Sequence, residues 1–198
     1  MQEKIIRKAT EMFLKLGFKS VTMDDIAGEM CISKKTIYKY FTNKEVLIAE
    51  GTAIIHNKIQ QIIGEIVAKN LNAIEENFEI KKMFREMFKS ADHSPIYQLK
   101  RYYPEIHEKL IATEIEDCTT IFDQNIQKGI KQGLYRENID IKTFVKFYYT
   151  LIFSLHETTQ RENEILKLEI QALEYHTRAI ATAEGIIELE KQLLNYNI

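Results

Sequence analysis

Residues 33–44 read SKKTIYKYFTNK, and this stretch decides the fold of the first part of the chain. Ser33 has a hydroxyl that can accept a hydrogen bond from a backbone N–H, as residues that precede a helix often do. A helix over residues 34–41 turns by about 100° per residue, which places Ile37 and Phe41 on the same, inward side. The stretch therefore predicts a short helix that is anchored on one face.

The opposite face of this helix carries side chains that suit a DNA groove. Lys35 and Lys39 point outward, where an ammonium group can reach O6 or N7 of guanine. Thr36, on one flank, has a methyl group that can contact thymine. Tyr38 and Tyr40 lie on opposite flanks, and each can donate a hydrogen bond to a phosphate. The segment thus predicts binding to double-stranded DNA.

The preceding residues supply the rest of a helix-turn-helix. Apolar residues at helical spacing predict a first helix over residues 3–16, and Gly17 ends it. Thr22 begins the sequence TMDD, a capping-box pattern that opens a second helix ending at Met30. Residues 31–33 form the break before the basic helix.

A long fourth helix is predicted to brace this unit. Residues 42–45 read TNKE, a second capping-box pattern, and the helix extends to about residue 69. Lys44 at its start, like Thr22 at the start of the second helix, lies beside backbone amides that favour an anion. Two short helices joined by a tight turn and braced by a third form a trihelical DNA-binding domain.

The distribution of charge supports the same interpretation. Residues 33–44 hold four lysines and no acidic residue, whereas the whole chain has 27 basic and 29 acidic residues. A solvated lysine face on an ordinary helix is the alternative explanation. The helix-turn-helix pattern and the two tyrosines favour a localised phosphate contact over that alternative.

The composition of the 198 residues predicts an all-α protein in two parts. Only 2 prolines and 7 glycines interrupt a chain that is 45% hydrophobic, so long helices and a sizeable core are expected. Residues 1–47 are assigned to the helix-turn-helix domain and residues 48–198 to a larger helical domain. Further helices are predicted at 72–90, 95–102, 104–132, 140–158, 163–180 and 184–195.

Other classes of protein are disfavoured by what the sequence contains. No apolar run approaches the roughly 20 residues that span a bilayer, and the first residues do not read as a signal peptide. The two cysteines are far apart, which fits the cytoplasm and gives no zinc site. No phosphate loop, nucleophile elbow or HExxH motif occurs, so neither catalysis nor a cofactor or metal is expected.

Residues 22–47 resemble the TetR/AcrR family of bacterial transcriptional regulators, and residues 9–18, ATEMFLKLGF, resemble the first helix of that family. The pattern S-x-x-T-x-Y-x-x-F-x-x-K over residues 33–44 has five positions of defined type and spacing. The resemblance covers about the first 50 residues. Beyond them, only the overall length and the helical character agree with the family.

The resemblance implies a homodimeric repressor that binds a palindromic operator and is released by a small molecule in the C-terminal domain. Ligand binding would move the fourth helix and separate the two DNA-binding heads. Transferred to this chain, the positions near the bases are Lys34, Lys35 and Thr36. The phosphate contacts are Thr22, Ser33, Tyr38, Tyr40 and Lys44.

Two residues depart from the family pattern. Cys31 stands where glycine is usual in the turn, so either it bears a left-handed backbone or the turn differs. Tyr40 stands where histidine is frequent, and its hydroxyl can still donate to a phosphate. Both departures affect the exact geometry of the DNA contacts and leave the resemblance itself intact.

The larger domain is predicted to supply the dimer interface and the ligand pocket. Residues 140–158 are apolar nearly all round and residues 163–180 have an apolar stripe, so together they can form half of a four-helix interface. An ordinary bundle within one chain is the alternative.

An apolar or aromatic effector is expected in that pocket. Aromatic residues at helical spacing are also typical of plain core, which is the alternative explanation for the candidates. A second functional hypothesis is a helical DNA-binding dimer controlled by a protein partner. The candidate pocket residues are Phe88, Tyr103, His107, Phe122, Phe147 and Tyr148.

Overall fold

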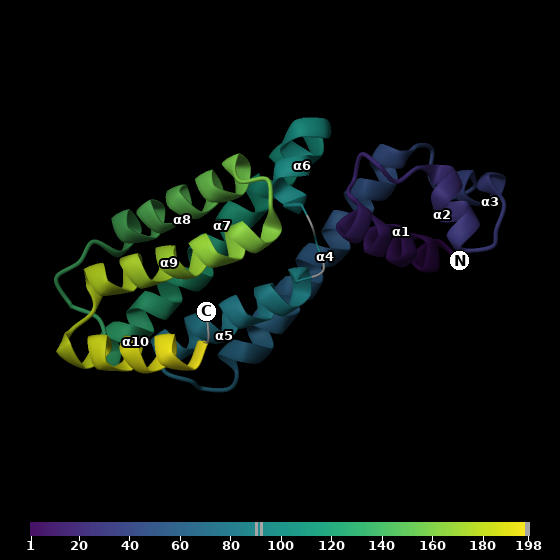
Figure 1. Ribbon diagram of the computed structural model, residues 1–198. Helices are drawn as coiled ribbons and strands as arrows, with labels where there is room; N and C mark the ends of the chain where they lie inside the picture. The colour runs from purple at the N-terminus through teal and green to yellow at the C-terminus, as the bar shows by residue number, and fades with distance from the viewer. Residues whose placement is uncertain (90, 92, 197–198) are drawn as a thin grey trace.

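The computed structural model describes residues 1–89, 91 and 93–196, which fold into an all-helical protein (Figure 1). Within these residues there is no strand, and one isolated antiparallel bridge joins Tyr135 to Ala181. The helices are α1 (Gln2–Leu16), α2 (Met23–Glu29), α3 (Lys34–Tyr38), α4 (Lys44–Val67), α5 (Ala73–Phe88), α6 (Pro95–Tyr102), α7 (Pro104–Lys131), α8 (Ile141–Thr158), α9 (Glu162–Ile180) and α10 (Ala183–Tyr196).

Two separate hydrophobic cores organise these helices. The first joins α1, α2, α3 and the start of α4 into a head at one end of the molecule (Figure 1). The second lies among α5, α7, α8, α9 and α10, which form the body. We use "head" for residues 1–47 and "body" for the remainder.

Helix α4 connects the head and the body without a break. Leu47 and Ile48 are fully buried in the core of the head. Ile59 and Ile63, on later turns of the same helix, are buried against the body. The boundary predicted between residues 47 and 48 therefore falls inside one continuous helix, which can transmit movement between the two parts.

The ends of the helices follow the predicted caps in most places. The Thr22 capping box is present, with both reciprocal hydrogen bonds to Asp25. The predicted box at residues 42–45 is wrong, because Asn43 caps α4 by accepting a hydrogen bond from the Val46 N–H at 2.9 Å. The Asn43 side chain, one residue later than the predicted cap at Thr42, accepts from a free amide of the first turn, so α4 begins at Lys44.

Two predicted helix ends also differ. The basic helix ends at Tyr38, and residues 39–41 continue as a turn in which the Phe41 N–H still donates to the Ile37 carbonyl at 3.1 Å. Ile37 and Phe41 are nonetheless both fully buried, as predicted. The helix predicted over 72–90 is described as far as Phe88, and its last residue, Ser90, lies outside the described residues.

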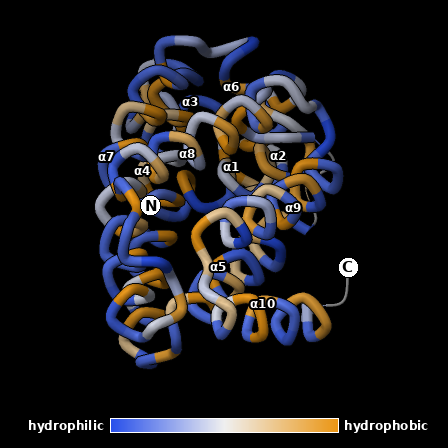
Figure 2. Tube along the Cα trace, turned by 90° about the vertical axis from the view of Figure 1, so that its left-hand side faces the viewer, coloured by the Kyte–Doolittle hydropathy of each residue, from blue (hydrophilic) through white to orange (hydrophobic). Residues whose placement is uncertain are grey.

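The helices of the body are amphipathic and pack around a shared interior. Figure 2 shows apolar and polar residues alternating along helices such as α5 and α10. The C-terminal helix is held against α5 by Arg85, whose guanidinium lies 4.5 Å from the centre of the Tyr196 ring. None of the described helices combines the length and apolar character that a bilayer crossing requires.

Candidate DNA-binding face and regulatory cavity

Helix α3 is positioned by one cap and two buried side chains. Ser33 accepts a hydrogen bond from the Thr36 N–H at 3.1 Å, which starts the helix. Ile37 and Phe41 then anchor it to α1, α2 and α4 through the core of the head. This arrangement fixes which side of α3 faces outward.

The turn before α3 contains the unusual backbone of Cys31. Its φ is 52°, in the left-handed region, so of the two possibilities Cys31 bears the strained conformation itself. For a residue other than glycine this costs roughly 1–2 kcal/mol. The turn is held by hydrogen bonds from the Cys31 N–H to the Gly28 carbonyl and from the Ile32 N–H to the Ala27 carbonyl, at 3.1 and 3.0 Å.

The outward side of α3 and the turn after it presents the predicted basic and aromatic side chains. Lys35 and Lys39 are exposed. Tyr38 and Tyr40 are 46% and 43% exposed, which is unusual for rings that have a hydrophobic core beside them. Exposed tyrosines next to lysines leave their hydroxyls and ammonium groups accessible to a phosphate backbone.

Lys34 lies at the edge of this face and is paired within the head. Its Nζ donates to Asp24 Oδ2 at 2.7 Å, from α3 to α2. Both side chains are exposed, so solvent screens the pair and it contributes little to stability. An interaction this weak can be exchanged for one with a phosphate or a base.

The Lys44 side chain packs into the junction between the head and the body. Its Nζ donates to the Lys19 carbonyl at 3.3 Å and lies 5.7 Å from the centre of the Tyr103 ring. Burial lowers the pKa of Lys44. The predicted phosphate contact therefore requires Lys44 to extend from this position or to act through its electric field.

The hydroxyls of Thr22 and Ser33 serve the helix starts. Thr22 Oγ1 donates to Asp25 Oδ2 at 2.7 Å, and Ser33 Oγ lies 2.8 Å from Thr36 Oγ1. All of these bonds are exposed to solvent. The two residues thus place two helix N-termini on the surface of the head, where backbone amides favour an anion.

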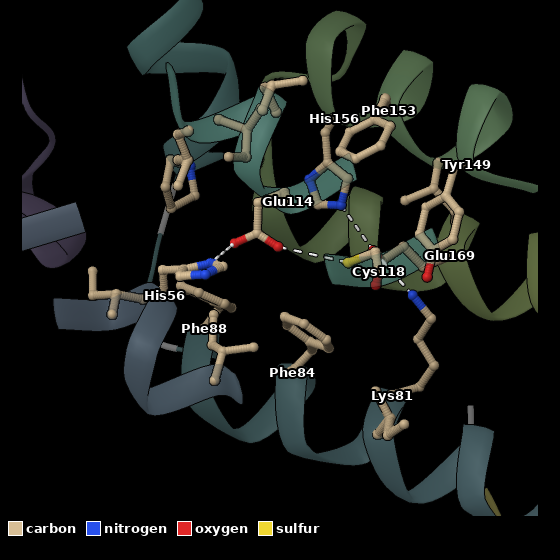
Figure 3. Close-up of a pocket in the computed structure, with 18 of the residues that line it drawn as sticks. His56, Lys81, Phe84, Phe88, Glu114, Cys118, Tyr149, Phe153, His156 and Glu169 are labelled. Carbon is tan, nitrogen blue, oxygen red and sulfur yellow. Dashed lines mark hydrogen bonds and ion pairs between the residues drawn. The ribbon is translucent and has the colours of Figure 1, made fainter. Parts of the chain in front are cut away.

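The body encloses a cavity of about 180 Å³ that extends to the head (Figure 3). Most of its lining is aliphatic or aromatic and comes from α4 to α9. Two head residues, Leu14 and Phe18, complete one end of it. Three of the predicted pocket residues line this cavity, namely Phe88, Phe122 and Tyr148.

The structure places the other three predicted pocket residues away from the cavity. Tyr103 packs on the core of the head and donates from its hydroxyl to the Phe18 carbonyl at 3.3 Å. His107 is buried, with Nε2 3.7 Å from Glu157 Oε1. Phe147 is 62% exposed on the outer side of α8. Helical spacing cannot show which face of a helix meets a cavity: His107 and Phe147 lie on other faces of α7 and α8, and Tyr103 lies between α6 and α7.

A first polar cluster in the cavity was not predicted from the sequence. His56 Nδ1 lies 2.7 Å from Glu114 Oε1, and His56 Nε2 lies 3.0 Å from Asp117 Oδ2 (Figure 3). Glu114 also accepts a long contact from the Cys118 thiol at 3.6 Å. Burial raises the pKa of Cys118 to about 12, so its sulfur stays protonated.

A second polar cluster is more deeply buried. Glu169 Oε1 lies 3.2 Å from Lys81 Nζ and 2.8 Å from His156 Nε2. Burial opposes ionisation of Glu169, but the charges of Lys81 and His156 outweigh burial and lower its pKa to about 2. Burial alone would also lower the pKa of Lys81, yet the Glu169 carboxylate raises it.

One signal in the sequence points to this second cluster. Glu169 stands four residues from both Ile165 and Leu173, on the apolar stripe of its helix. Lys81 stands three residues from both Phe78 and Phe84, again on an apolar face. A charge on the inward face of two different helices indicates a buried pair.

Helix α6 joins the cavity to the head. Gln98 Oε1 accepts a hydrogen bond from the Phe18 N–H at 2.9 Å, just after α1 ends. Leu99 is part of the core of the head and also lines the cavity. A change in the shape of the cavity therefore acts directly on residues that position α1.

The outer sides of α8 and α9 expose three large apolar side chains among polar ones. Phe147 and Tyr175 are 62% and 72% exposed, and Leu151 is exposed on the next turn of α8. Among the described residues no cluster of His, Cys, Asp and Glu could hold a metal ion.

Comparisons with known proteins agree with this architecture. Residues 5–50 match the family described as "Bacterial regulatory proteins, tetR family". The chain is 26% identical over 148 residues to the negative transcriptional regulator IcaR of the Staphylococcus aureus biofilm operon icaADBC, a match that covers 75% of this chain and 69% of IcaR.

Solved structures share the whole fold. A transcriptional regulator from Cytophaga hutchinsonii superposes with a TM-score of 0.74 at 18% identity, over 91% of this chain and 98% of that one. Thermus thermophilus FadR, a TetR-family repressor solved in complex with lauroyl-CoA, superposes with a TM-score of 0.55 at 17% identity, over 87% and 93%. At these identities the likeness concerns the fold alone.

Proposed function

Since the chain belongs to the TetR family of bacterial transcriptional regulators, we propose that it is a homodimeric repressor released from its operator by a small molecule. Two heads bind the two halves of a palindromic operator, and the cavity in each body receives the effector. The proposed place of action is the cytoplasm.

Contact with DNA is supported by the outer face of the head. Lys35, Lys39, Tyr38 and Tyr40 are exposed together, beside the two capped helix starts. Lysine, tyrosine and backbone amides are the groups that contact phosphates, while the first residues of α3 are placed to meet base edges. These side chains are exposed, so they do not contribute to a hydrophobic core, and their types do not form a catalytic site.

Homodimerisation is supported by the outer side of α8 and α9. A monomer seldom exposes several large apolar side chains on adjacent helices without a partner. Two copies of this surface form a four-helix interface in which each residue meets its equivalent across a two-fold axis. Operator palindromes reflect the same symmetry.

Control by a ligand is supported above all by the position of the cavity, which lies between the body and the head. Its walls include Leu14 and Phe18 of the head and Leu99 of α6. A ligand that pushes α6 outward pulls on the Phe18 N–H through Gln98 and tilts α1 with the rest of the head. A change in the angle of each head alters the separation of the two α3 helices.

Two similar proteins support repression and a small-molecule effector. IcaR is named a negative regulator, and FadR was solved with lauroyl-CoA. The largely aliphatic and aromatic lining of the cavity suits an apolar or aromatic ligand. A ligand-sized cavity also favours a small molecule over a protein partner as the controlling signal.

Selection of bound fragments from random DNA by the full chain tests the proposal. We expect a palindrome whose half-sites are spaced to suit two heads, and binding that weakens steeply with salt. An asymmetric site, or binding that ignores sequence, would contradict the proposal.

A further inference from the structure

Glu162 is a buried carboxylate in the wall of the cavity. It is 3% exposed, and its Oε2 has no hydrogen-bond partner among the described residues. His156 Nδ1, also in the wall, is buried without a partner in the same part of the chain. Buried polar atoms are almost always paired, so two unpaired ones in one cavity indicate a role in ligand binding.

Glu162 lacks the ion-pair contacts that the other carboxylates of the two clusters make. Glu114 and Asp117 share His56, and Glu169 receives both Lys81 and His156. Lys81, the one lysine of the two clusters, thus already has Glu169 as its partner. Glu162 has no lysine or arginine of its own among the described contacts.

Aromatic rings surround the same space. Figure 3 shows Phe84, Phe88, Phe153 and Tyr149 arranged around the two clusters. The faces of aromatic rings attract cations, and the attraction is stronger where water is excluded. Rings and an unpaired carboxylate together favour a positively charged ligand over a neutral or anionic one.

The size of the cavity limits the ligand. Its volume is about 180 Å³, and an apolar cavity of about 150 Å³ is known to hold a benzene molecule. A body of one aromatic ring with a short tail therefore fits without rearrangement of the helices.

We propose that the cavity binds a small organic cation, an apolar body of about one ring that carries a protonated amine, and that Glu162 is the carboxylate that receives the amine. The inference rests on the proposed ligand control and specifies its chemistry.

The protonation of Glu162 supplies a measurable signature. Burial raises the pKa of Glu162 to about 7, with the Glu169 charge raising it and His156 opposing. A cation bound beside Glu162 stabilises its charged form and lowers that pKa again. Binding of an amine near pH 7 should therefore release a proton from the protein.

Calorimetric titration of the full chain with three probes of similar shape tests the proposal. The probes are phenethylamine, 2-phenylethanol and 3-phenylpropanoate, which are cationic, neutral and anionic. We expect phenethylamine to bind at least about tenfold more tightly than the alcohol, as a charge-assisted hydrogen bond does, and the anion to bind most weakly. The heat should vary with the ionisation enthalpy of the buffer and report proton release.

A pair of matched variants locates the effect. Glu162→Gln should remove both the preference for the amine and the proton release, whereas Glu164→Gln, exposed on the same helix, should keep both. Thermal melting shows whether each variant remains folded. The proposal is overturned if no probe binds, if the anion binds most tightly, or if Glu162→Gln keeps the preference.

Measurement of operator affinity with and without phenethylamine separates this inference from the proposed function. Tight amine binding that leaves operator affinity unchanged would overturn ligand control and leave the amine site standing. Loss of operator binding with a neutral ligand alone would support ligand control and overturn the amine site.

Discussion

The head and the body are both helical, but they bury different kinds of side chain. The core of the head is made of apolar residues such as Ile5, Phe13 and Ile37. In the described parts of the chain, the buried polar and charged residues all belong to the body, from Thr52 onward. They include Glu76, Glu162 and Glu169. The head is therefore a DNA-binding platform built on an apolar core, while the body holds buried groups that can respond to a ligand or a proton.

The largest expected effect tests whether the core of the head can be disrupted without unfolding the body. Phe41→Ala removes a fully buried ring from the head, which costs about 3–5 kcal/mol. We expect operator binding to be abolished while the body stays folded and dimeric, as followed by circular dichroism and sedimentation. Tyr40→Ala, at the exposed neighbouring position, should leave the head folded. If the head and the body of Phe41→Ala unfolded together, the two parts would not be independent in stability.

The next effect tests the role of the body in holding two heads together. Phe147→Asp places a charge on the proposed interface and should convert the dimer to a monomer in sedimentation. Operator affinity should fall by about 100-fold or more, because two linked heads bind with a large avidity gain. Lys146→Glu, on the adjacent exposed position of α8, should remain dimeric. A dimeric Phe147→Asp would place the interface elsewhere.

A smaller effect concerns a single contact on the platform. Tyr38→Phe removes one hydroxyl from an exposed ring, and we expect about a tenfold loss of operator affinity at fixed salt, as for one hydrogen bond to a charged phosphate. Thermal stability should not change. Tyr102→Phe, at an exposed tyrosine of α6 outside the proposed dimer interface, serves as the control. Equal operator binding by Tyr38→Phe and the native chain would remove Tyr38 from the contact set.

The last effect is a pH dependence of stability that belongs to the body. Burial lowers the pKa of His176 to about 4, below its ordinary value of 6.5. Below pH 6.5 the His176 side chain takes up a proton in the unfolded chain but not in the folded one. The contribution of His176 to the free energy of unfolding is therefore complete above pH 6.5 and decreases as the pH falls from 6.5 towards 4. Its slope is about 1.4 kcal/mol per pH unit.

His176→Phe should flatten this part of the profile of unfolding free energy, because a ring that does not titrate replaces the imidazole beside Phe122 and Tyr148. His93→Phe, at an exposed position, should leave the profile unchanged. An unaltered slope in His176→Phe would assign the acid sensitivity to other groups.

The same difference between head and body explains how far the sequence could be interpreted. Helix positions in both parts followed from apolar spacing, caps and the few prolines and glycines, which are local signals. The inward Ile37 and Phe41 and the outward Lys35 and Tyr38 followed from helical geometry alone. The cap at Asn43 and the end of α3 at Tyr38 were missed, because neighbouring residues offered competing local hydrogen bonds.

In the body the sequence determined the helices but not their contacts. Phe88, Phe122 and Tyr148 meet at the cavity, while Tyr103 packs on the head and Phe147 faces outward. The five residues have similar apolar and aromatic character, and only the packing angles of the helices decide which face each one meets.

The sequence by itself determined a helical chain whose first 50 residues form a TetR-type head, because a cap, a period and a turn are properties of neighbouring residues. Only the tertiary structure brought Lys81 of α5 to Glu169 of α9 and left Glu162 buried in an aromatic cavity. Residues so far apart along the chain interact through the arrangement of whole helices, and that arrangement depends on the packing of all the cores at once.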